Sequence, residues 1–278
     1  MANQIAMEKF VSIDGLKIRY FEEGKGPAVL LLHGTSLGAS ADVWEGNLLP
    51  LARHGFRVIA FDQPGFGLSD NPKDFSASYR RKFIFRFMDA LEIEKAHLVG
   101  HSSAGRMAVT LAFEEPERIV KAIALGTGSL LPPLKENQKQ SGAAEGEEGS
   151  SSEPSRDEIR ALLEQHLFNH SLITPEAVEK RYRMSIGKNF QAFLERAKAA
   201  EKGGGKEGVP LWQRLDQLPV PLLLIYGKQD RGSAGERAQM LKERFPRLRV
   251  HVLDRCKHLV QWDGADEFVR LSAEFLAV

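Results

Sequence analysis

Cysteine is almost absent from this chain. Among 278 residues there is a single one, Cys256, so no disulfide can form within the chain. Long hydrophobic runs are missing too: none reaches the roughly 18 apolar residues of a membrane span, and residues 1–15 hold no apolar run of signal-peptide length. We therefore expect a protein of the reducing cytoplasm, with a buried Cys256 and no membrane association.

An excess of charge of either sign is also absent. The chain has 38 basic and 37 acidic residues, a formal net charge of +1. A nucleic-acid surface needs a concentration of positive charge, so no nucleic-acid partner is expected. The stretch 34-GTSLG-38 lacks the lysine of a phosphate loop, and no G-x-G-x-x-G follows a strand, so nucleotide binding is not expected either.

Short apolar runs alternate with stretches of helical periodicity. The runs are 27–34, 56–65, 96–102, 119–128, 220–227 and 248–254, after a hairpin at 11–24. The helical stretches are 77–93, 104–115, 234–245 and 265–277. This alternation predicts an α/β fold whose mostly parallel sheet is covered by helices on both faces. The carboxyl ends of parallel strands share one edge, and a site is expected there.

The alternation stops between Gly128 and Pro219, where only helical patterns occur. We predict a core formed by 1–128 and 213–278, with residues 129–212 inserted as a helical cap. The helical patterns of the cap are 156–168, 175–186 and 188–200. Segments rich in Gly, Ser, Glu and Lys near 141–155 and 202–208 are predicted to be flexible linkers.

Two adjacent serines lie in the stretch 97-HLVGHSSAGRM-107, which is close to the G-x-S-x-G pattern of a nucleophile elbow. An elbow is a sharp strand-to-helix turn, and the residues two before and two after its apex must be small. With Ser102 at the apex they are glycine and alanine, whereas with Ser103 the first would be His101. We predict Ser102 as the nucleophile; the alternative is an ordinary junction in which the serine caps the helix.

A serine nucleophile needs a histidine base, and the histidine needs a carboxylate that fixes its tautomer. In folds with this elbow the chain order is serine, then an acid, then histidine. Asp230 follows the apolar run 220–227, and His258 follows the run 248–254. Both should lie with Ser102 at the carboxyl edge of the sheet, so we predict a catalytic triad of these three residues.

An oxyanion hole requires two backbone N–H groups directed at the developing negative charge. The residue after the nucleophile, Ser103, supplies one in folds with this elbow. The second should come from the loop 33-HGTSLG-38, with Thr35 as the first candidate and Ser36 as the second.

These motifs resemble those of the α/β-hydrolases over nearly the whole chain, and more narrowly those of the meta-cleavage-product hydrolases. The matching stretches are 62-DQPGFGLSD-70, 98-LVGHSSAG-105 and 255-RCKHLVQWDGADEF-268. That family cleaves carbon–carbon bonds in ring-fission products of aromatic degradation. The resemblance implies a vinylogous diketo acid as substrate, which is ketonised before serine attacks the carbonyl, with no metal or organic cofactor.

The resemblance also extends to the cap. Arg181 matches an arginine that binds the substrate carboxylate in the family, and Trp212 belongs to the same similarity. The alternative role of Arg181 is a solvated charge on a helix.

The chain departs from the family around the expected substrate. His101 stands where asparagine is usual, Leu259 where tryptophan is usual, and Asn47 lies one position away from an expected asparagine. We count His101, Leu259 and Ser36 as candidate substrate-binding residues. Because of these departures a carboxylesterase acting on small esters stays open. A ligand receptor with little turnover also stays open, because some proteins of this fold keep the triad yet serve as receptors.

The remaining histidines show no metal-ligand spacing except His166 and His170, which are four apart in a predicted helix. Because no carboxylate pattern accompanies them, we predict a surface face for this pair and no metal site. The sequence leaves open whether the chain forms a homo-oligomer.

Overall fold

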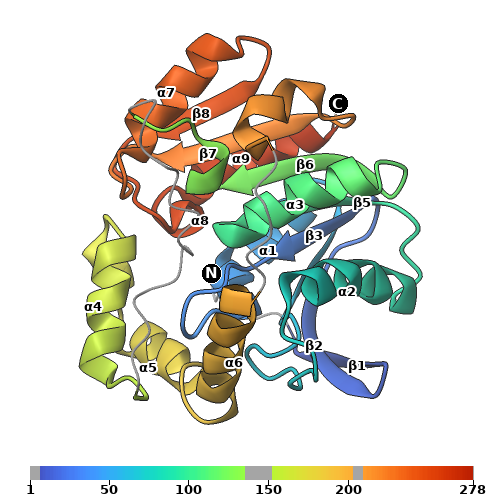
Figure 1. Cartoon of the computed structure of the whole chain (residues 1–278), viewed down its shortest axis with the longest axis vertical. Helices are drawn as coiled ribbons and strands as arrows, with labels where there is room; N and C mark the ends of the chain where they lie inside the picture. Colours follow the sequence, from blue (N-terminus) through green and yellow to red (C-terminus); the bar gives the residue numbers. More distant parts are fainter. Residues whose placement is uncertain (1–6, 135–151, 203–208, 278) are drawn as a thin grey trace.

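An eight-stranded sheet runs through the centre of the molecule in the order β1-β2-β4-β3-β5-β6-β7-β8 (Figure 1). The structure is a computed structural model, and it describes residues 7–134, 152–202 and 209–277. The strands are β1 (Lys9–Ile13), β2 (Leu16–Glu23), β3 (Ala28–Leu32), β4 (Arg57–Phe61), β5 (Ala96–His101), β6 (Ile119–Leu125), β7 (Leu222–Gly227) and β8 (Arg249–Leu253). Strand β2 runs opposite to the other seven strands, so the predicted mostly parallel sheet is confirmed.

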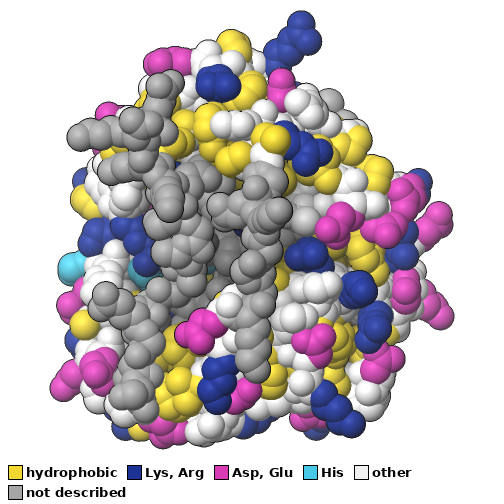
Figure 2. All heavy atoms as spheres, in the orientation of Figure 1, with side chains coloured by type: hydrophobic (Ala, Val, Ile, Leu, Met, Phe, Trp, Pro, Cys, Tyr) yellow, Lys and Arg dark blue, Asp and Glu magenta, His cyan; other side chains and the backbone are white. Residues whose placement is uncertain are grey.

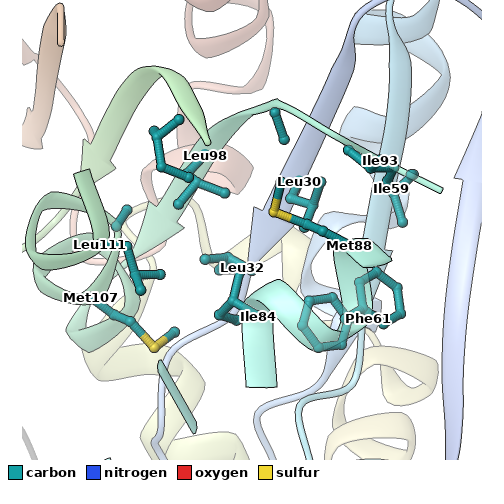
Figure 3. Packing of buried hydrophobic residues seen from close by; sticks show 14 of the residues in the cluster. Leu30, Leu32, Ile59, Phe61, Ile84, Met88, Ile93, Leu98, Met107 and Leu111 are labelled. Carbon is teal, nitrogen blue, oxygen red and sulfur yellow. The ribbon is translucent and has the colours of Figure 1, made fainter. Parts of the chain in front are cut away.

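Helices cover both faces of the sheet, as the alternating pattern predicted. They are α1 (Glu45–Ala52), α2 (Ala77–Ala90), α3 (Ser103–Glu114), α7 (Ala234–Arg244), α8 (Val260–Asp263) and α9 (Ala265–Ala277). Strand β3 is buried throughout, and its side chains alternate between two apolar clusters. Val29 and Leu31 pack with α1 and α9 on one face, whereas Leu30 and Leu32 pack with α2 and α3 on the other (Figure 3).

Three further helices lie between β6 and β7 in the chain: α4 (Arg156–His166), α5 (Pro175–Arg183) and α6 (Lys188–Lys202). Figure 1 shows them together at the side of the molecule toward which β3 and β5 run. Helix α4 begins with a capping box formed by Ser155 and Glu158, and α5 begins with a Thr174 cap followed by Pro175.

Helices α4 and α5 are joined to the rest of the protein by a small apolar cluster around Leu259. Its other buried members are Ile159, Leu163, Leu167, Ile173 and Val178. Residues 141–151 and 203–208 of the predicted linkers lie outside the described residues, so their flexibility stays a prediction.

In the described part of the chain, no helix is both long and apolar enough to cross a membrane. On the described surface visible in Figure 2, acidic and basic side chains are interspersed. This distribution agrees with the balanced composition of the sequence.

Candidate active site

Ser102 occupies a sharp turn between β5 and α3. Its backbone is in a left-handed region that side-chain-bearing residues rarely adopt, with φ 57° and ψ −127°. Three hydrogen bonds hold it there: its N–H donates to Leu125 O (2.8 Å), and its carbonyl accepts from Gly105 N (2.9 Å) and Thr127 Oγ1 (2.9 Å). The turn therefore has the geometry predicted for a nucleophile elbow.

Small residues are required around this turn for steric reasons. A Cβ added at Gly100 would collide with the backbone carbonyl of Ala104, and one added at Gly105 would collide with Thr127 Oγ1. The chain folds back on itself at Gly100, two residues before Ser102, which explains why this position is small and agrees with the choice of Ser102 over Ser103.

The structure brings Ser102, His258 and Asp230 into one hydrogen-bonded chain. His258 Nε2 lies 3.0 Å from Ser102 Oγ, and His258 Nδ1 lies 3.0 Å from Asp230 Oδ2. All three residues are buried. Since the Asp230 carboxylate can only accept, Nδ1 carries the proton and Nε2 is free to accept the serine proton. The other carboxylate oxygen of Asp230 accepts from Arg231 N (2.7 Å).

A second imidazole, that of His101, packs directly against His258. The two ring centroids are 4.8 Å apart, and His101 Nε2 donates to the backbone carbonyl of His258 over 2.9 Å. Burial, together with His258, holds the pKa of His101 well below its ordinary value. His101 is thus a neutral ring that fixes the position of His258, and its contact with substrate stays a prediction.

A third imidazole contradicts the sequence prediction. His166 is not part of a surface face: it is only 2% exposed, and its ring centroid lies 5.1 Å from that of His258. Burial, followed by the neighbouring His258 and Arg181, lowers its pKa strongly. His170 is exposed, as predicted. The overlooked signal was helical: His166 continues the apolar face of Ile159 and Leu163 at positions i, i+4 and i+7.

The loop after β3 passes beside the serine. A Cβ placed on Gly34 would lie 3.2 Å from Ser102 Cβ and 3.7 Å from its Oγ. The two predicted oxyanion-hole residues lie together, because Thr35 Oγ1 and Ser103 Oγ are 3.0 Å apart. Ser36 instead accepts a hydrogen bond from Arg181 Nη2 (2.9 Å), so it lies on the side of the site that faces α5.

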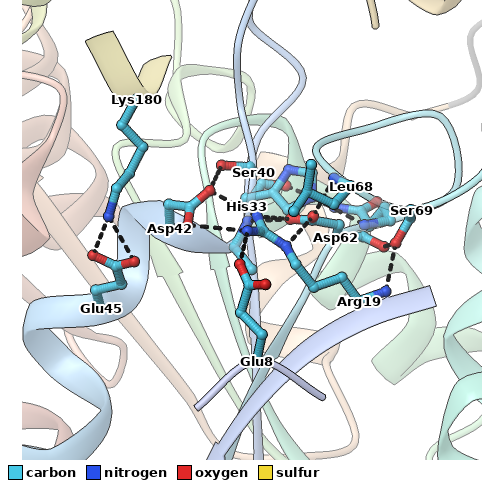
Figure 4. Close-up of polar contacts among 12 residues, drawn as sticks. Glu8, Arg19, His33, Ser40, Asp42, Glu45, Asp62, Leu68, Ser69 and Lys180 are labelled. Carbon is cyan, nitrogen blue, oxygen red and sulfur yellow. Dashed lines mark hydrogen bonds and ion pairs between the residues drawn. The ribbon is translucent and has the colours of Figure 1, made fainter. Parts of the chain in front are cut away.

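Arg181 reaches this loop from α5, and close packing fixes the contact. Gly38 has a positive φ of 73°, and a Cβ there would collide with Ser185 Oγ and crowd the Arg181 backbone. The neighbouring Lys180 bonds both carboxylate oxygens of Glu45, at 2.8 and 2.7 Å (Figure 4). The structure therefore places Arg181 beside the predicted oxyanion loop rather than in solvent.

The other two predicted substrate contacts differ from one another. Leu259 is buried next to His258 and packs with α4 and α5. Trp212 packs in a separate apolar cluster with Leu131 and Leu215, and Arg244 lies over its ring at 5.0 Å. No hydrogen bond or ring contact within the described residues links Trp212 to the three triad candidates.

A buried ion-pair network supports the loops at this edge of the sheet (Figure 4). Arg19 bonds Asp62 through Nε (2.6 Å) and Nη2 (3.1 Å), and it bonds Asp42 through Nη2 (2.7 Å). Asp62 also accepts from the backbone N–H groups of Ala41 and Leu68. The network therefore ties the loops after β3 and β4 to the antiparallel strand β2.

His33 links these loops to the oxyanion region. Gln63 N–H donates to His33 Nε2 (3.1 Å), so the ring proton is on Nδ1, which donates to Gly34 O (2.7 Å). The side chain of Gln63 in turn donates to His33 O (2.8 Å). No role was predicted for His33 or Gln63 from the sequence, because neither residue belongs to a motif that indicates one.

Among the described residues, no group of three or more His, Cys, Asp or Glu side chains could hold a metal ion. Cys256 is free and buried, as predicted.

Comparison with known proteins adds an independent finding. Residues 27–265 match the family model described as alpha/beta hydrolase fold. The chain is 33% identical to a 2-hydroxy-6-oxononadienedioate/2-hydroxy-6-oxononatrienedioate hydrolase of Comamonas testosteroni, over 99% of this chain and 98% of the relative. It is 33% identical to a 2-hydroxy-6-oxo-6-phenylhexa-2,4-dienoate hydrolase of Burkholderia cepacia, over 97% of this chain and 96% of the relative.

Solved structures of meta-cleavage product hydrolases have a similar fold. A meta-cleavage product hydrolase from Pseudomonas fluorescens superimposes with a TM-score of 0.76 at 29% identity, covering 97% of both chains. A 2-hydroxy-6-oxo-6-phenylhexa-2,4-dienoate hydrolase from Rhodococcus gives a TM-score of 0.79 at 25% identity, covering 98% of this chain and 99% of the other.

Proposed function

This chain belongs to the α/β-hydrolase family and its relatives are meta-cleavage product hydrolases, and from that premise we propose that it hydrolyses a carbon–carbon bond in 2-hydroxy-6-oxo-dienoates. The catalytic residues in this proposal are Ser102, His258 and Asp230. The observation that supports their roles most directly is the hydrogen-bonded chain from Asp230 through His258 to Ser102 Oγ.

The proposed reaction begins with ketonisation, in which the enol proton leaves the oxygen on C2 and a proton is added at C5. Ser102 Oγ then attacks the C6 carbonyl while His258 Nε2 takes its proton, and Asp230 stabilises the resulting imidazolium. The backbone N–H groups of Thr35 and Ser103 stabilise the oxyanion. The C5–C6 bond breaks, its electron pair passes into the departing dienol, and water hydrolyses the acyl-enzyme. A 6-phenyl substrate and one water thus give benzoate, 2-hydroxypenta-2,4-dienoate and one proton.

Arg181 is proposed to hold the substrate carboxylate. It lies beside the loop that contains Thr35, bonded to Ser36 Oγ. A guanidinium matches a carboxylate with two parallel hydrogen bonds, and in a sheltered site such a charge-assisted pair contributes about 1.5–3 kcal/mol.

A carboxylesterase is the second candidate function, and the residues around the triad favour it. His101 and Leu259 stand where the family has asparagine and tryptophan, so two expected contacts with the dienoate are altered. A receptor with little turnover is the third candidate. Turnover per Ser102 separates this last possibility from both enzymes.

The discriminating experiment offers purified protein a 6-phenyl dienoate and a neutral short-chain aryl ester side by side. Arg181→Ala should lower kcat/KM for the dienoate by roughly 10- to 150-fold and leave the ester nearly unchanged. Arg181→Lys should restore only part of the loss, because an ammonium cannot form the planar pair. Arg183→Ala is the matched control, since Arg183 is on the same helix but pairs with Glu179 at the surface. Equal losses on both substrates would instead mean that Arg181 only supports the cap.

We further propose that residues 129–212 act as a cap over this site and that the protein works in the cytoplasm. The first proposal is supported by the bonds from α5 and α6 to the core, such as Lys180 to Glu45 at the start of α1 and Arg196 to Gly65 O. The second is supported by the single cysteine.

A further inference from the structure

The position of His166 is fixed by many contacts between the end of α4 and the loop that contains His258. Lys257 Nζ donates to Glu164 O (2.8 Å), and Leu259 N donates to His166 O (3.0 Å). The Asp263 carboxylate accepts from Phe168 N and Asn169 N on one side and from Lys257 N on the other, each at 2.9 Å. Although His166 is part of the proposed cap, it is thus bonded to the core.

This firm placement leaves a polar atom unsatisfied. His166 Nε2 is buried and has no hydrogen-bond partner among the described residues. Leaving such an atom unpaired is costly, and an apolar residue would fill the same place on the apolar face of α4 without that cost. An orphaned nitrogen next to the proposed general base is therefore an indication of a ligand.

The surroundings of His166 define the chemistry of that ligand. Its ring is 5.1 Å from that of His258, and Arg181 is close enough to contribute to the lowering of its pKa. The carboxylate of the triad, Asp230, is already engaged by His258 and Arg231 N. On this side of the site lie the Arg181 cation and the His166 imidazole, and together they suit a carboxylate with an oxygen on the adjacent carbon.

We propose that the His166 imidazole hydrogen-bonds the oxygen on C2 of the substrate, beside the carboxylate held by Arg181. This inference rests on the proposed function for the role of Arg181. A neutral imidazole suits both forms of the substrate, because in its Nδ1–H tautomer Nε2 accepts from the enol O–H, and in its Nε2–H tautomer the same nitrogen donates to the 2-oxo group. His166 is then a specificity residue for 2-oxo and 2-hydroxy acids.

Two ligands that differ only at C2 test this directly: 2-oxopentanoate and pentanoate. Calorimetric titration of the wild-type protein should show 2-oxopentanoate binding more tightly, by roughly fivefold to tenfold, as expected for one hydrogen bond to a buried group. His166→Phe keeps an aromatic ring against His258 but no nitrogen, and it should abolish the preference. His166→Gln should keep part of it, because the amide is also both donor and acceptor.

Two controls separate recognition of C2 from other effects. Arg181→Ala should weaken both ligands by similar factors and preserve their ratio. His170→Phe changes an exposed histidine of the same segment and should leave both affinities unchanged.

A preference that survives in His166→Phe would overturn the proposal, and so would a wild-type protein that binds both acids equally. Dienoate turnover by the same preparation would in that case leave the proposed function standing. Conversely, a preference lost in His166→Phe without any dienoate turnover would support the role of His166 and reject the carbon–carbon hydrolase.

Discussion

The neighbouring residues Ser102 and Ser103 differ in backbone conformation and in the group that each hydroxyl contacts. Ser102 is at positive φ, and its Oγ lies 3.0 Å from His258 Nε2. Ser103 is the first residue of α3, and its Oγ lies 3.0 Å from Thr35 Oγ1. The turn thus directs the Ser102 side chain to His258 and the Ser103 side chain to the loop after β3, an arrangement that suits the roles proposed for these two residues.

The two serines should consequently respond differently to the same substitution. Ser102→Ala is expected to lower kcat by several orders of magnitude, on the order of 10⁴ or more, because the nucleophile is lost. Ser103→Ala keeps the backbone N–H and should retain substantial activity. Steady-state kinetics of both variants measure this, together with mass spectrometry after labelling by an organophosphonate. Labelling of Ser103, or similar losses in both folded variants, would refute the assignment.

The residues of the hydrogen-bonded chain could be found from the sequence because folds with this elbow have a fixed chain order of serine, acid and histidine, and each of these residues follows a predicted strand. His166 could not be assigned in the same way. A histidine on the apolar face of a helix has the same pattern whether it fills a core or meets a ligand, and only the fold brings α4 against the His258 loop.

Among the elements, the strands were the most predictable, because short and nearly continuous apolar runs that alternate with helical patterns are typical of buried parallel strands. Helix α1 was missed. It is eight residues long and contains Gly46 and Pro50, both poor helix formers, and packing of Leu48 and Leu51 in the core outweighs their propensity. The orientation of α4, α5 and α6 was not predictable either, because it depends on contacts with loops far away in sequence.

The junction of β5 and α3 should tolerate no additional atom at Gly100. Gly100→Ala places a methyl group against the Ala104 carbonyl and should lower the free energy of unfolding by about 1–3 kcal/mol. Gly46→Ala is the matched control: no atom lies within 4 Å of the added Cβ, and the change should raise helix stability by up to about 1 kcal/mol. Urea denaturation of both variants gives the comparison, and a neutral Gly100→Ala would contradict this account of the elbow.

The attachment of α4 to the His258 loop should depend on Asp263. Asp263→Ala removes the acceptor of three backbone N–H groups and should lower the free energy of unfolding by about 2 kcal/mol or more. Dienoate kcat/KM should fall as well, because His166 loses its fixed place. Asp266→Ala changes an exposed carboxylate in the first turn of α9 and serves as the control. Equal behaviour of the two variants in thermal unfolding and kinetics would show that the attachment is not needed.

At the scale of the whole molecule, the charges nearly balance, yet several histidines are buried as neutral rings. The sequence predicted the layers of the fold and the edge that holds the site. It did not predict this burial, because a histidine within or next to an apolar run can be either buried or exposed to solvent. His33, His97 and His101 are the examples with buried rings on strands or directly after them.

The buried histidines should make the protein sensitive to acid. Burial lowers the pKa of His97 to about 4 and that of His33 to about 3. In the unfolded chain a histidine titrates near 6.5, so below that pH the unfolded chain binds protons that the folded chain does not. The free energy of unfolding should then fall with decreasing pH by about 1.4 kcal/mol per pH unit for each histidine, down to the folded pKa. Above pH 6.5 neither residue contributes to the pH dependence.

His97→Leu isolates one of these contributions. His97 packs edge-on against Phe56, and a leucine of similar size keeps that contact apolar. Between pH 7 and pH 5 the wild-type protein should lose roughly 2 kcal/mol more than the variant, because only the wild-type unfolded chain takes up the proton of residue 97. Urea denaturation at pH 7, 6 and 5 measures the two slopes, with His170→Leu as the control at an exposed position. If the free energy of unfolding falls with the same pH slope in wild type, His97→Leu and His170→Leu, the buried imidazole is not the source of the acid sensitivity.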